Sequence, residues 1–241
     1  MPLGQINAAI ARLRVGGFVP YSSVDCPGEL AAVVFLQGCS WACDYCQNPH
    51  LRSFKKTGEE SWERVLGALQ ERRGLLDMVI FSGGEPLAQI GLEEAMAQVR
   101  AMDFKVGLHS AGTSPRRLRA VLPVCDWVGL DIKAMAPDYA ALTHHANSGR
   151  MAWECLDLLL AAELRYEVRT TWHPQLMPLE RLMELAEQLR ARGVRYFRLQ
   201  ALRGRGCLRP ELDDWPPAHL DAATQAELAA MFDDFSWRYA G

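Results

Sequence analysis

AAVVFLQGCSWACDYC, residues 31–46, joins an apolar run to three closely spaced cysteines. The run ends at Leu36 and predicts a buried strand, and Cys39, Cys43 and Cys46 follow in the loop that leaves it. Three thiolates at this C-x3-C-x2-C spacing can hold three irons of a [4Fe–4S] cluster, whereas clusters that only transfer electrons usually have four thiolates. The fourth iron would then be free to bind a substrate or cofactor. The stretch therefore indicates chemistry at the metal.

The same cysteines leave a second kind of metal site open. With His50 the spacing becomes C-x3-C-x2-C-x3-H, which is compatible with a structural zinc site of the Cys3His type. The other cysteines are scattered and predict neither a second cluster nor a disulfide framework: Cys26, Cys125, Cys155 and Cys207. Of these, Cys26 is expected to be a small buried hydrophobic residue. Free thiols and an iron–sulfur site both favour a reducing cytoplasm.

Composition places the chain among ordinary globular proteins. It has 241 residues, 49% hydrophobic and 23% charged, with a formal net charge of −3. We expect one domain over residues 1–241, since α/β barrels of this length occur undivided. The charge predicts no nucleic-acid partner, and no apolar stretch is long enough to span a membrane. The first residues lack a basic region before an apolar core, so we expect no secretory signal and a cytoplasmic location.

Short β-rich runs alternate with amphipathic helical patterns along the chain. We expect six strands, over residues 33–37, 78–81, 105–109, 127–132, 166–172 and 196–201. We expect helices over residues 61–73, 92–102, 151–164, 179–192 and 218–236, and a short one after Pro115. This alternation predicts parallel strands joined by crossover helices, and six units predict an α/β fold that is a partial (β/α)6 barrel. A doubly wound sheet is the alternative. The core then spans about residues 16–200, followed by an irregular loop and a C-terminal helix over 202–241.

Both folds put chemistry at the carboxyl ends of the strands, and two predicted strand ends carry candidate site residues. Ser82-Gly83-Gly84-Glu85-Pro86 follows the second strand, and its two glycines allow the backbone to approach a ligand closely, or form only a tight turn. The fourth strand ends in Asp131-Ile132-Lys133. Alternation puts Asp131 and Lys133 on one side, where they form an ion pair or hold the polar groups of a zwitterionic ligand.

The fifth predicted strand adds two further candidates. Arg169 is a charge in an otherwise β-rich run, and an inward-facing arginine would bind a carboxylate or another electron-rich group. His173 follows at the carboxyl end of the same strand, where it either faces the site or has a structural role. His144 and His145 lie in a loop and are expected to be solvated.

Together these motifs resemble the radical S-adenosylmethionine (SAM) superfamily. The resemblance includes Tyr45 before the last cysteine, the Gly-Gly-Glu-Pro turn and the Asp-x-Lys strand end. More narrowly, VDCPG over residues 24–28, FLQGC over 35–39 and CQNP over 46–49 resemble the glycyl-radical-enzyme activases, above all those that serve anaerobic ribonucleoside-triphosphate reductase. The similarity covers roughly residues 16–200.

The resemblance implies a radical SAM oxidoreductase with a [4Fe–4S] cluster and SAM as cofactors. Such an enzyme cleaves SAM reductively and abstracts a hydrogen atom from a glycine of a glycyl-radical enzyme, its protein substrate. A flavodoxin- or ferredoxin-type protein would donate the electron. A radical SAM enzyme that acts on a small molecule, similar to carboxy-deazaguanine synthase, is the alternative, and a zinc-binding module without enzymatic activity is a weaker one.

The resemblance also implies roles for individual residues. Cys39, Cys43 and Cys46 would ligate the cluster, and SAM would be bound by a second set: Tyr45, Gly83, Gly84, Glu85, Ser110, Asp131, Lys133, Arg169 and His173. Where a relative has Asp-Thr-Asn-Gly after the third strand, this chain has His109-Ser110-Ala111-Gly112. The acid is missing, so the resemblance does not carry over a monovalent-cation site.

Cluster ligation can be tested by replacing each cysteine in turn. Cys39→Ala, Cys43→Ala and Cys46→Ala should each abolish the iron–sulfur absorbance and SAM cleavage, because each removes one of only three thiolates. The matched controls Cys125→Ala, Cys155→Ala and Cys207→Ala should keep both. Full SAM cleavage by Cys43→Ala would refute the assignment.

Overall fold

A single open sheet forms the centre of the molecule. The computed structural model describes residues 10–56 and 58–238, and its strands form one eight-stranded sheet in chain order. The first two strands are antiparallel, and all other neighbours are parallel. The strands are β1 (Val15–Ser22), β2 (Ala31–Leu36), β3 (Met78–Gly83), β4 (Lys105–Ser110), β5 (Trp127–Asp131), β6 (Arg165–Trp172), β7 (Tyr196–Ala201) and β8 (Asp234–Arg238).

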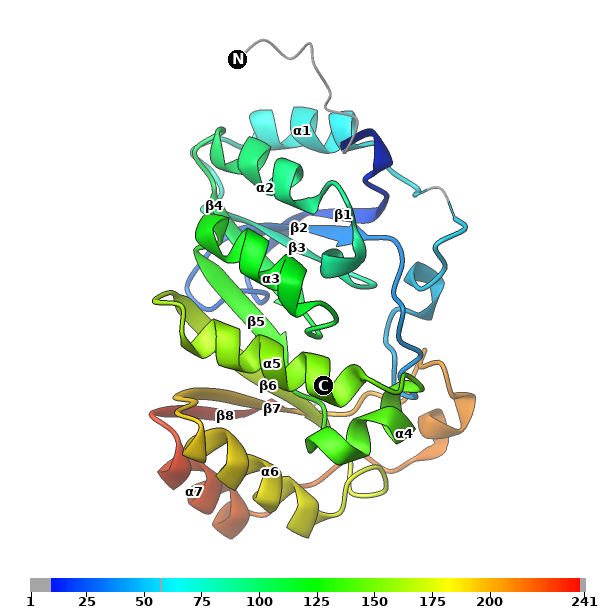
Figure 1. The fold of residues 1–241 in the computed structure, drawn as a ribbon, viewed down its shortest axis with the longest axis vertical. Helices are drawn as coiled ribbons and strands as arrows, with labels where there is room; N and C mark the ends of the chain where they lie inside the picture. Colours follow the sequence, from blue (N-terminus) through cyan, green and yellow to red (C-terminus); the bar gives the residue numbers. More distant parts are fainter. Residues whose placement is uncertain (1–9, 57, 239–241) are drawn as a thin grey trace.

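The helices cover one face of this sheet, as Figure 1 shows. The α-helices are α1 (Trp62–Gln70), α2 (Leu92–Arg100), α3 (Pro115–Val121), α4 (Tyr139–Thr143), α5 (Ser148–Leu160), α6 (Leu179–Ala191) and α7 (Ala222–Met231). Short 3₁₀ helices are η1 (Ile10–Arg12), η2 (Pro49–Leu51), η3 (Pro86–Ala88), η4 (Leu122–Val124), η5 (Ala136–Asp138) and η6 (Pro210–Asp214). A doubly wound sheet would carry helices on both faces. The predicted partial barrel is therefore confirmed, and β1 and β8 form its unpaired edges among the described residues.

The central strands are buried on both faces, which explains their nearly continuous apolar sequences. In β2 and β3, Val34 and Phe81 pack against the helices, whereas Val33 and Ile80 belong to a separate apolar cluster on the inner face of the sheet. Cys26 is fully buried in that inner cluster, as expected from the sequence. None of the described helices is both long and apolar enough to cross a membrane.

The helix boundaries follow from local capping. Ser61 and Ser114 accept hydrogen bonds from the backbone three residues on, and so begin α1 and α3. The six predicted strands correspond to β2–β7, each displaced by at most a few residues. The predicted helices over 61–73, 92–102, 151–164 and 179–192 correspond to α1, α2, α5 and α6.

Two strands were not predicted from the sequence, and one predicted helix is too long. β1 contains two glycines and a proline, which weaken a strand, and its pairing with β2 is irregular. The helix expected over 218–236 is wrong in its second half, because α7 ends at Met231 and β8 follows. Phe235 and Trp237 pack on the helix side of β8, and Arg238 lies on the opposite side. Side chains that alternate between two faces in this way are typical of a strand.

Residues 23–30 close the inner face at the amino ends of the strands; we call them the closing segment. Glu29 is buried, and its carboxylate binds Lys105 at 2.8 Å and Arg165 at 2.7 Å. Burial raises the pKa of Glu29, but the hydrogen bonds and charges of these two cations outweigh burial and hold the pKa below its usual value. The closing segment thereby ties the β1–β2 connection to β4 and β6.

Loss of this carboxylate should loosen the amino ends of the strands. Glu29→Ala is expected to lower the free energy of unfolding by about 2 kcal/mol, because it removes charge-assisted hydrogen bonds to two cations. Urea denaturation at pH 7 measures the effect. Glu187→Ala, on the exposed side of α6 and without an ion pair among the described residues, is the control and should change little. Equal stability of the two variants would contradict the role of Glu29.

Candidate functional site

The three cysteines lie in a loop that crosses the carboxyl edge of the sheet after β2. We call residues 37–54 the cysteine loop; it descends along the right-hand side of Figure 1. Backbone hydrogen bonds hold its two ends together, from Gly38 N to Leu51 O at 2.6 Å and from Cys39 N to Arg52 O at 3.0 Å. The loop therefore has a fixed base on the sheet.

The cysteine side chains suit a metal cluster better than they suit free thiolates. Cys39, Cys43 and Cys46 are half-buried and form no disulfide. Burial raises the pKa of Cys39 to about 12 and also raises that of Cys43, against the opposing charge of Lys133. Thiols in such surroundings lose their protons only to a strongly positive partner, and iron is one. This donor set fits the three-cysteine cluster expected from the sequence.

The alternative zinc site with His50 is not assembled. The His50 side chain is exposed. Over residues 10–56 and 58–238, no three His, Cys, Asp or Glu side chains converge as ligands of one ion would, and this holds for the three cysteines alone as well as for the Cys3His set.

The glycine turn after β3 lies directly against the cysteine loop. Gly83 has φ = 120°, which favours glycine, and Glu85 N donates to Gly38 O at 2.9 Å. A Cβ atom at Gly84 would lie 2.7 Å from Gly38 O and 2.8 Å from Leu51 O. Glycine is thus required at this position by the close approach of the two backbones. The glycine at position 84 was expected to leave room for a ligand, but the contact between the two backbones is enough to explain why glycine is there.

Glu85 is the buried centre of this turn. Its carboxylate accepts hydrogen bonds from Ser110 Oγ (2.8 Å), Ala111 N (2.9 Å) and Leu87 N (3.0 Å). Burial raises the pKa of Glu85 to about 7, and the hydrogen bonds offset only part of that effect. Ser110, expected as a SAM contact, also accepts from Gly112 N, so its hydroxyl supports the turn.

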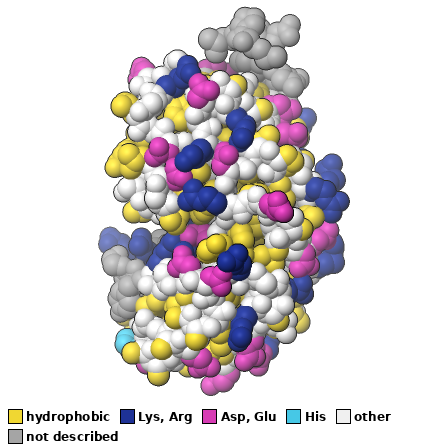
Figure 2. Space-filling model, turned by 90° about the vertical axis from the view of Figure 1, so that its left-hand side faces the viewer, with side chains coloured by type: hydrophobic (Ala, Val, Ile, Leu, Met, Phe, Trp, Pro, Cys, Tyr) yellow, Lys and Arg dark blue, Asp and Glu magenta, His cyan; other side chains and the backbone are white. Residues whose placement is uncertain are grey.

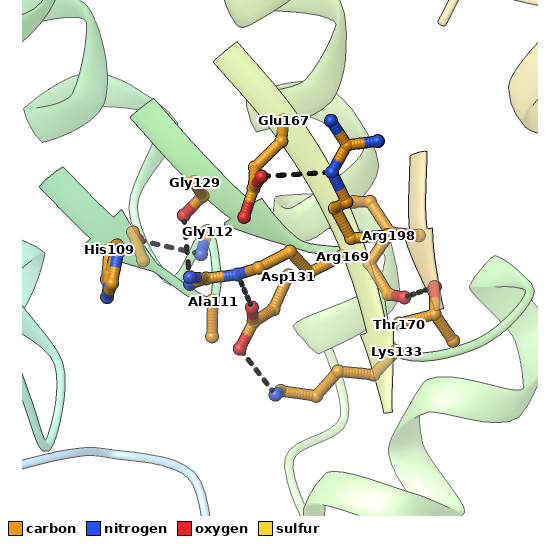
Figure 3. Close-up of polar contacts among 12 residues, drawn as sticks. His109, Ala111, Gly112, Gly129, Asp131, Lys133, Glu167, Arg169, Thr170 and Arg198 are labelled. Atoms are coloured by element: carbon orange, nitrogen blue, oxygen red, sulfur yellow. Dashed lines mark hydrogen bonds and ion pairs between the residues drawn. The ribbon is translucent and has the colours of Figure 1, made fainter. Parts of the chain in front are cut away.

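A chain of three charges lies at the carboxyl ends of β5 and β6 (Figure 3). Asp131 Oδ2 is 3.2 Å from Lys133 Nζ, and Asp131 Oδ1 is 3.0 Å from Arg169 Nε. The same-side placement of Asp131 and Lys133 expected from alternation is confirmed. Burial would raise the pKa of Asp131, but the two cations lower it to about 2. Two cations face one carboxylate, so the group carries an excess positive charge.

Tyr45 brings the cysteine loop to these charges. Lys133 Nζ lies 5.4 Å from the centre of the Tyr45 ring, a cation–π distance. The Tyr45 hydroxyl is buried and has no partner of good hydrogen-bond geometry among the described residues; burial raises its pKa, and the nearby Lys133 ammonium offsets part of that effect. A cavity of about 460 Å³ lies on one side of Tyr45 and Lys133, and most of its lining comes from η5, α4 and the β6–α6 connection; neither the three cysteines nor Asp131 nor Arg169 line it. An unpaired buried hydroxyl is unfavourable, so this atom suits a polar ligand.

His173 does not join the other candidates. Its Nε2 donates to Pro216 O at 2.9 Å, its Nδ1 accepts from Gln175 N, and its ring stacks on Trp215 with 4.7 Å between centres. Only 2% of the residue is exposed. Both ring nitrogens are therefore engaged, and the expectation of a ligand contact is corrected to a structural role.

Two further histidines lie near the site. His109 lies on the inner face of β4, where burial, and next the Arg169 charge, lower its pKa to about 3. Its Nε2 therefore donates to Asp25 O, at 3.0 Å. Alternation with the buried Leu108 would have predicted this inward position. His144 is exposed, as expected, and its Nε2 also pairs with the buried Asp44 of the cysteine loop at 2.8 Å.

The irregular stretch after β7 covers the cysteine loop. Gln47 donates to Arg203 O at 2.6 Å, and Arg209 binds Asp44 at 3.1 Å. Tyr45 packs in a small apolar cluster with Leu202, Cys207 and Leu212. In Figure 1 this orange stretch lies beside the blue loop. The sequence predicted an irregular loop here, but nothing in it indicated this contact.

Comparison with known proteins identifies relatives. The model of the Radical SAM superfamily matches residues 33–171. A Methanocaldococcus jannaschii protein provisionally assigned as a glycyl-radical enzyme activating enzyme is 26% identical over 73% of this chain and 75% of its own length. Pyruvate formate-lyase-activating enzyme of Clostridium pasteurianum is 33% identical over 56% of this chain and 59% of its own. The 7-carboxy-7-deazaguanine synthase of Methanopyrus kandleri is 29% identical over 44% of this chain and 50% of its own.

Solved structures support the fold. A radical SAM methyltransferase from Sphaerobacter thermophilus has a TM-score of 0.65 at 15% identity, over 89% of this chain and 67% of that one. Streptococcus suis SuiB bound to S-adenosylmethionine has a TM-score of 0.62 at 10% identity, over 84% of this chain. The chain spans 48% of the length of SuiB.

Glu85 should make the stability of the cofactor-free protein depend on pH. Its pKa is about 7 in the folded protein, above the usual 4.5, so the folded state holds a proton that the unfolded state has lost. Stability should therefore decrease as pH rises from about 5 to about 8, by at most about 3 kcal/mol from this group. Glu85→Gln should flatten this dependence in urea denaturation. Glu163→Gln, an exposed control, should keep the wild-type slope; equal slopes for both variants would contradict the assignment.

Proposed function

Since the chain belongs to the radical SAM superfamily, and is a radical SAM oxidoreductase that uses a [4Fe–4S] cluster and SAM, we propose that it is a glycyl-radical-enzyme activase. The partner we propose is anaerobic ribonucleoside-triphosphate reductase. The observation that carries the activase assignment is the similarity to activating enzymes, which covers 73% of the chain in one relative and 56% in another. The motifs over residues 24–49 support the choice of partner.

In this proposal Cys39, Cys43 and Cys46 hold the cluster, and SAM binds between them and the charged group of Asp131, Lys133 and Arg169. Once bound, the cluster supplies one electron for the reductive cleavage of SAM, which provides the radical that removes a hydrogen atom from glycine. The residues of the chain bind and orient these groups and exclude water. The covering stretch after β7 and the packing of Tyr45 against Leu212 limit solvent access.

The charges at the ends of β5 and β6 suit a zwitterion. Lys133 and Arg169 share one carboxylate, so their remaining N–H donors are available to a carboxylate of the ligand. Asp131 remains ionised at neutral pH between them and suits an ammonium group or ribose hydroxyls. We propose that the turn at Gly83, Gly84 and Glu85 places backbone groups beside the amino end of SAM.

A small-molecule radical SAM enzyme is the second candidate. The similarity to a 7-carboxy-7-deazaguanine synthase favours it, although that alignment covers less of this chain than those with the activating enzymes. The open sheet supports the activase, because a peptide loop needs lateral access to the inner face, between the unpaired edges β1 and β8. The zinc module is not proposed, because the family uses an iron–sulfur cluster.

Electron paramagnetic resonance separates the two candidates. The anaerobically reduced protein with SAM should install a doublet glycyl-radical signal on the reductase, with one SAM consumed per radical. Replacing the radical-bearing glycine of the reductase by alanine should remove the signal and leave complex formation intact. If no glycyl-radical protein acquires a radical, while a small heterocyclic substrate is turned over many times, the second candidate replaces the first.

A further inference from the structure

A surface hollow of about 710 Å³ lies beside the base of the cysteine loop. It is bounded by the start of β1, the residues that follow the cysteine loop, and the turn between β3 and α2. Its lining includes Arg12, Arg14, Phe54 and Ile90. We call it, together with Lys55 and Lys56 that directly follow Phe54, the basic hollow.

One aromatic ring in the lining of the basic hollow, that of Phe54, contacts the residue before the first cysteine. A Cβ atom at Gly38 would lie 2.4 Å from the Phe54 ring, so the ring packs closely against that glycine. Gly38 directly precedes Cys39, whose backbone donates to Arg52 O at 3.0 Å. Phe54 therefore has one side on the cysteine loop and the other at the surface.

The composition of the hollow is that of a protein-binding surface. Phe54 is 42% exposed and Ile90 is 44% exposed, although both are large apolar residues. Apolar side chains surrounded by arginine are enriched at the centres of protein interfaces. Arg14 is fixed there by hydrogen bonds to Phe54 O and from its own backbone N–H to Gln89 Oε1.

The positive charge of the hollow is not neutralised by the protein itself. Arg12, Arg14, Lys55 and Lys56 are exposed, and none forms an ion pair with another described residue. Two acids lie in the same stretch: Glu60, in the lining, binds Arg64 at 2.8 Å, and the exposed Glu59 lies beside it, so the four cations still outnumber the acids.

The face at the amino ends of the strands differs. There the two signs are interspersed (Figure 2), as in the pairs Arg73–Asp103 and Arg100–Asp126. The chain as a whole has a net charge of −3. Unpaired cations beside the cysteine loop are thus a local feature.

We propose that the basic hollow is the docking surface of the acidic protein that delivers the electron to the cluster. This inference rests on the proposed function, because the site then needs one electron from outside for each SAM cleaved. In the transfer the donor loses one electron, the cluster gains it, and no bond is made or broken at the surface. Opposite charges orient the two proteins and accelerate their association. Phe54, which packs against the residue before Cys39, would then lie at the contact between the donor and the cysteine loop.

Charge reversal tests this surface. Arg12→Glu/Lys55→Glu/Lys56→Glu should slow reduction of the cluster-loaded protein by reduced flavodoxin at least about tenfold at low ionic strength, measured by stopped-flow absorbance. The difference should vanish at high salt, because these charges are exposed. The matched control Arg116→Glu/Arg119→Glu changes two exposed cations of α3 that form no ion pair among the described residues, and should reduce at the wild-type rate.

A chemical reductant distinguishes this inference from the proposed function. With photoreduced deazaflavin, which needs no docking surface, the triple variant should cleave SAM as fast as the wild type. The docking surface would be overturned if flavodoxin reduced the triple variant at the wild-type rate. It would also be overturned if the control variant were slowed as much as the triple variant. Normal reduction with loss of radical transfer to the glycyl-radical enzyme would assign the hollow to that partner instead. Failure of the chemically reduced wild type to cleave SAM would overturn the proposed function itself.

Discussion

The close backbone contact between Gly38 and Gly84 holds the candidate site together. It joins the loop that carries the cysteines to the turn after the neighbouring strand, and the parallel register of β2 and β3 brings the two segments side by side. A side chain at Gly84 would force the two backbones apart. The cysteine positions, the Glu85 hydrogen bonds and the packing of Phe54 on Gly38 all depend on this one approach.

Electrostatics at the site are arranged around a few buried groups. Asp131 is kept ionised by two cations, whereas Glu85, with neutral donors only, has a raised pKa. Asp131 and Glu85, both at the carboxyl edge of the sheet, thus differ in average charge near pH 7. This difference arises from whether the partner is a cation or a neutral N–H or O–H group.

The sequence predicted the parts of the structure that depend on local patterns. Alternation of strands and helices gave the fold, and the spacing within Asp131-Ile132-Lys133 gave the shared side of its two charges. The edges of the sheet were missed, because β1 has weak strand residues and the start of β8 continues a helical pattern. The direction of His173 was also missed, since it depends on Pro216, which is distant in the sequence and belongs to an irregular stretch. Contacts of that kind arise from tertiary packing and leave no local periodicity.

The closing segment has a geometric consequence for the other end of the barrel. Glu29 links the connection between β1 and β2 to Lys105 on β4 and to Arg165 on β6. It therefore spans the curved sheet as a chord spans an arc. A chord of fixed length across an arc of fixed length sets its curvature. Because the strands run from one rim to the other, we expect a change in these ion pairs to alter the spacing at the opposite rim as well, between the cysteine loop and Arg169. A substitution at Glu29 would therefore alter the width of the inner face of the sheet without changing any residue at the carboxyl ends of the strands.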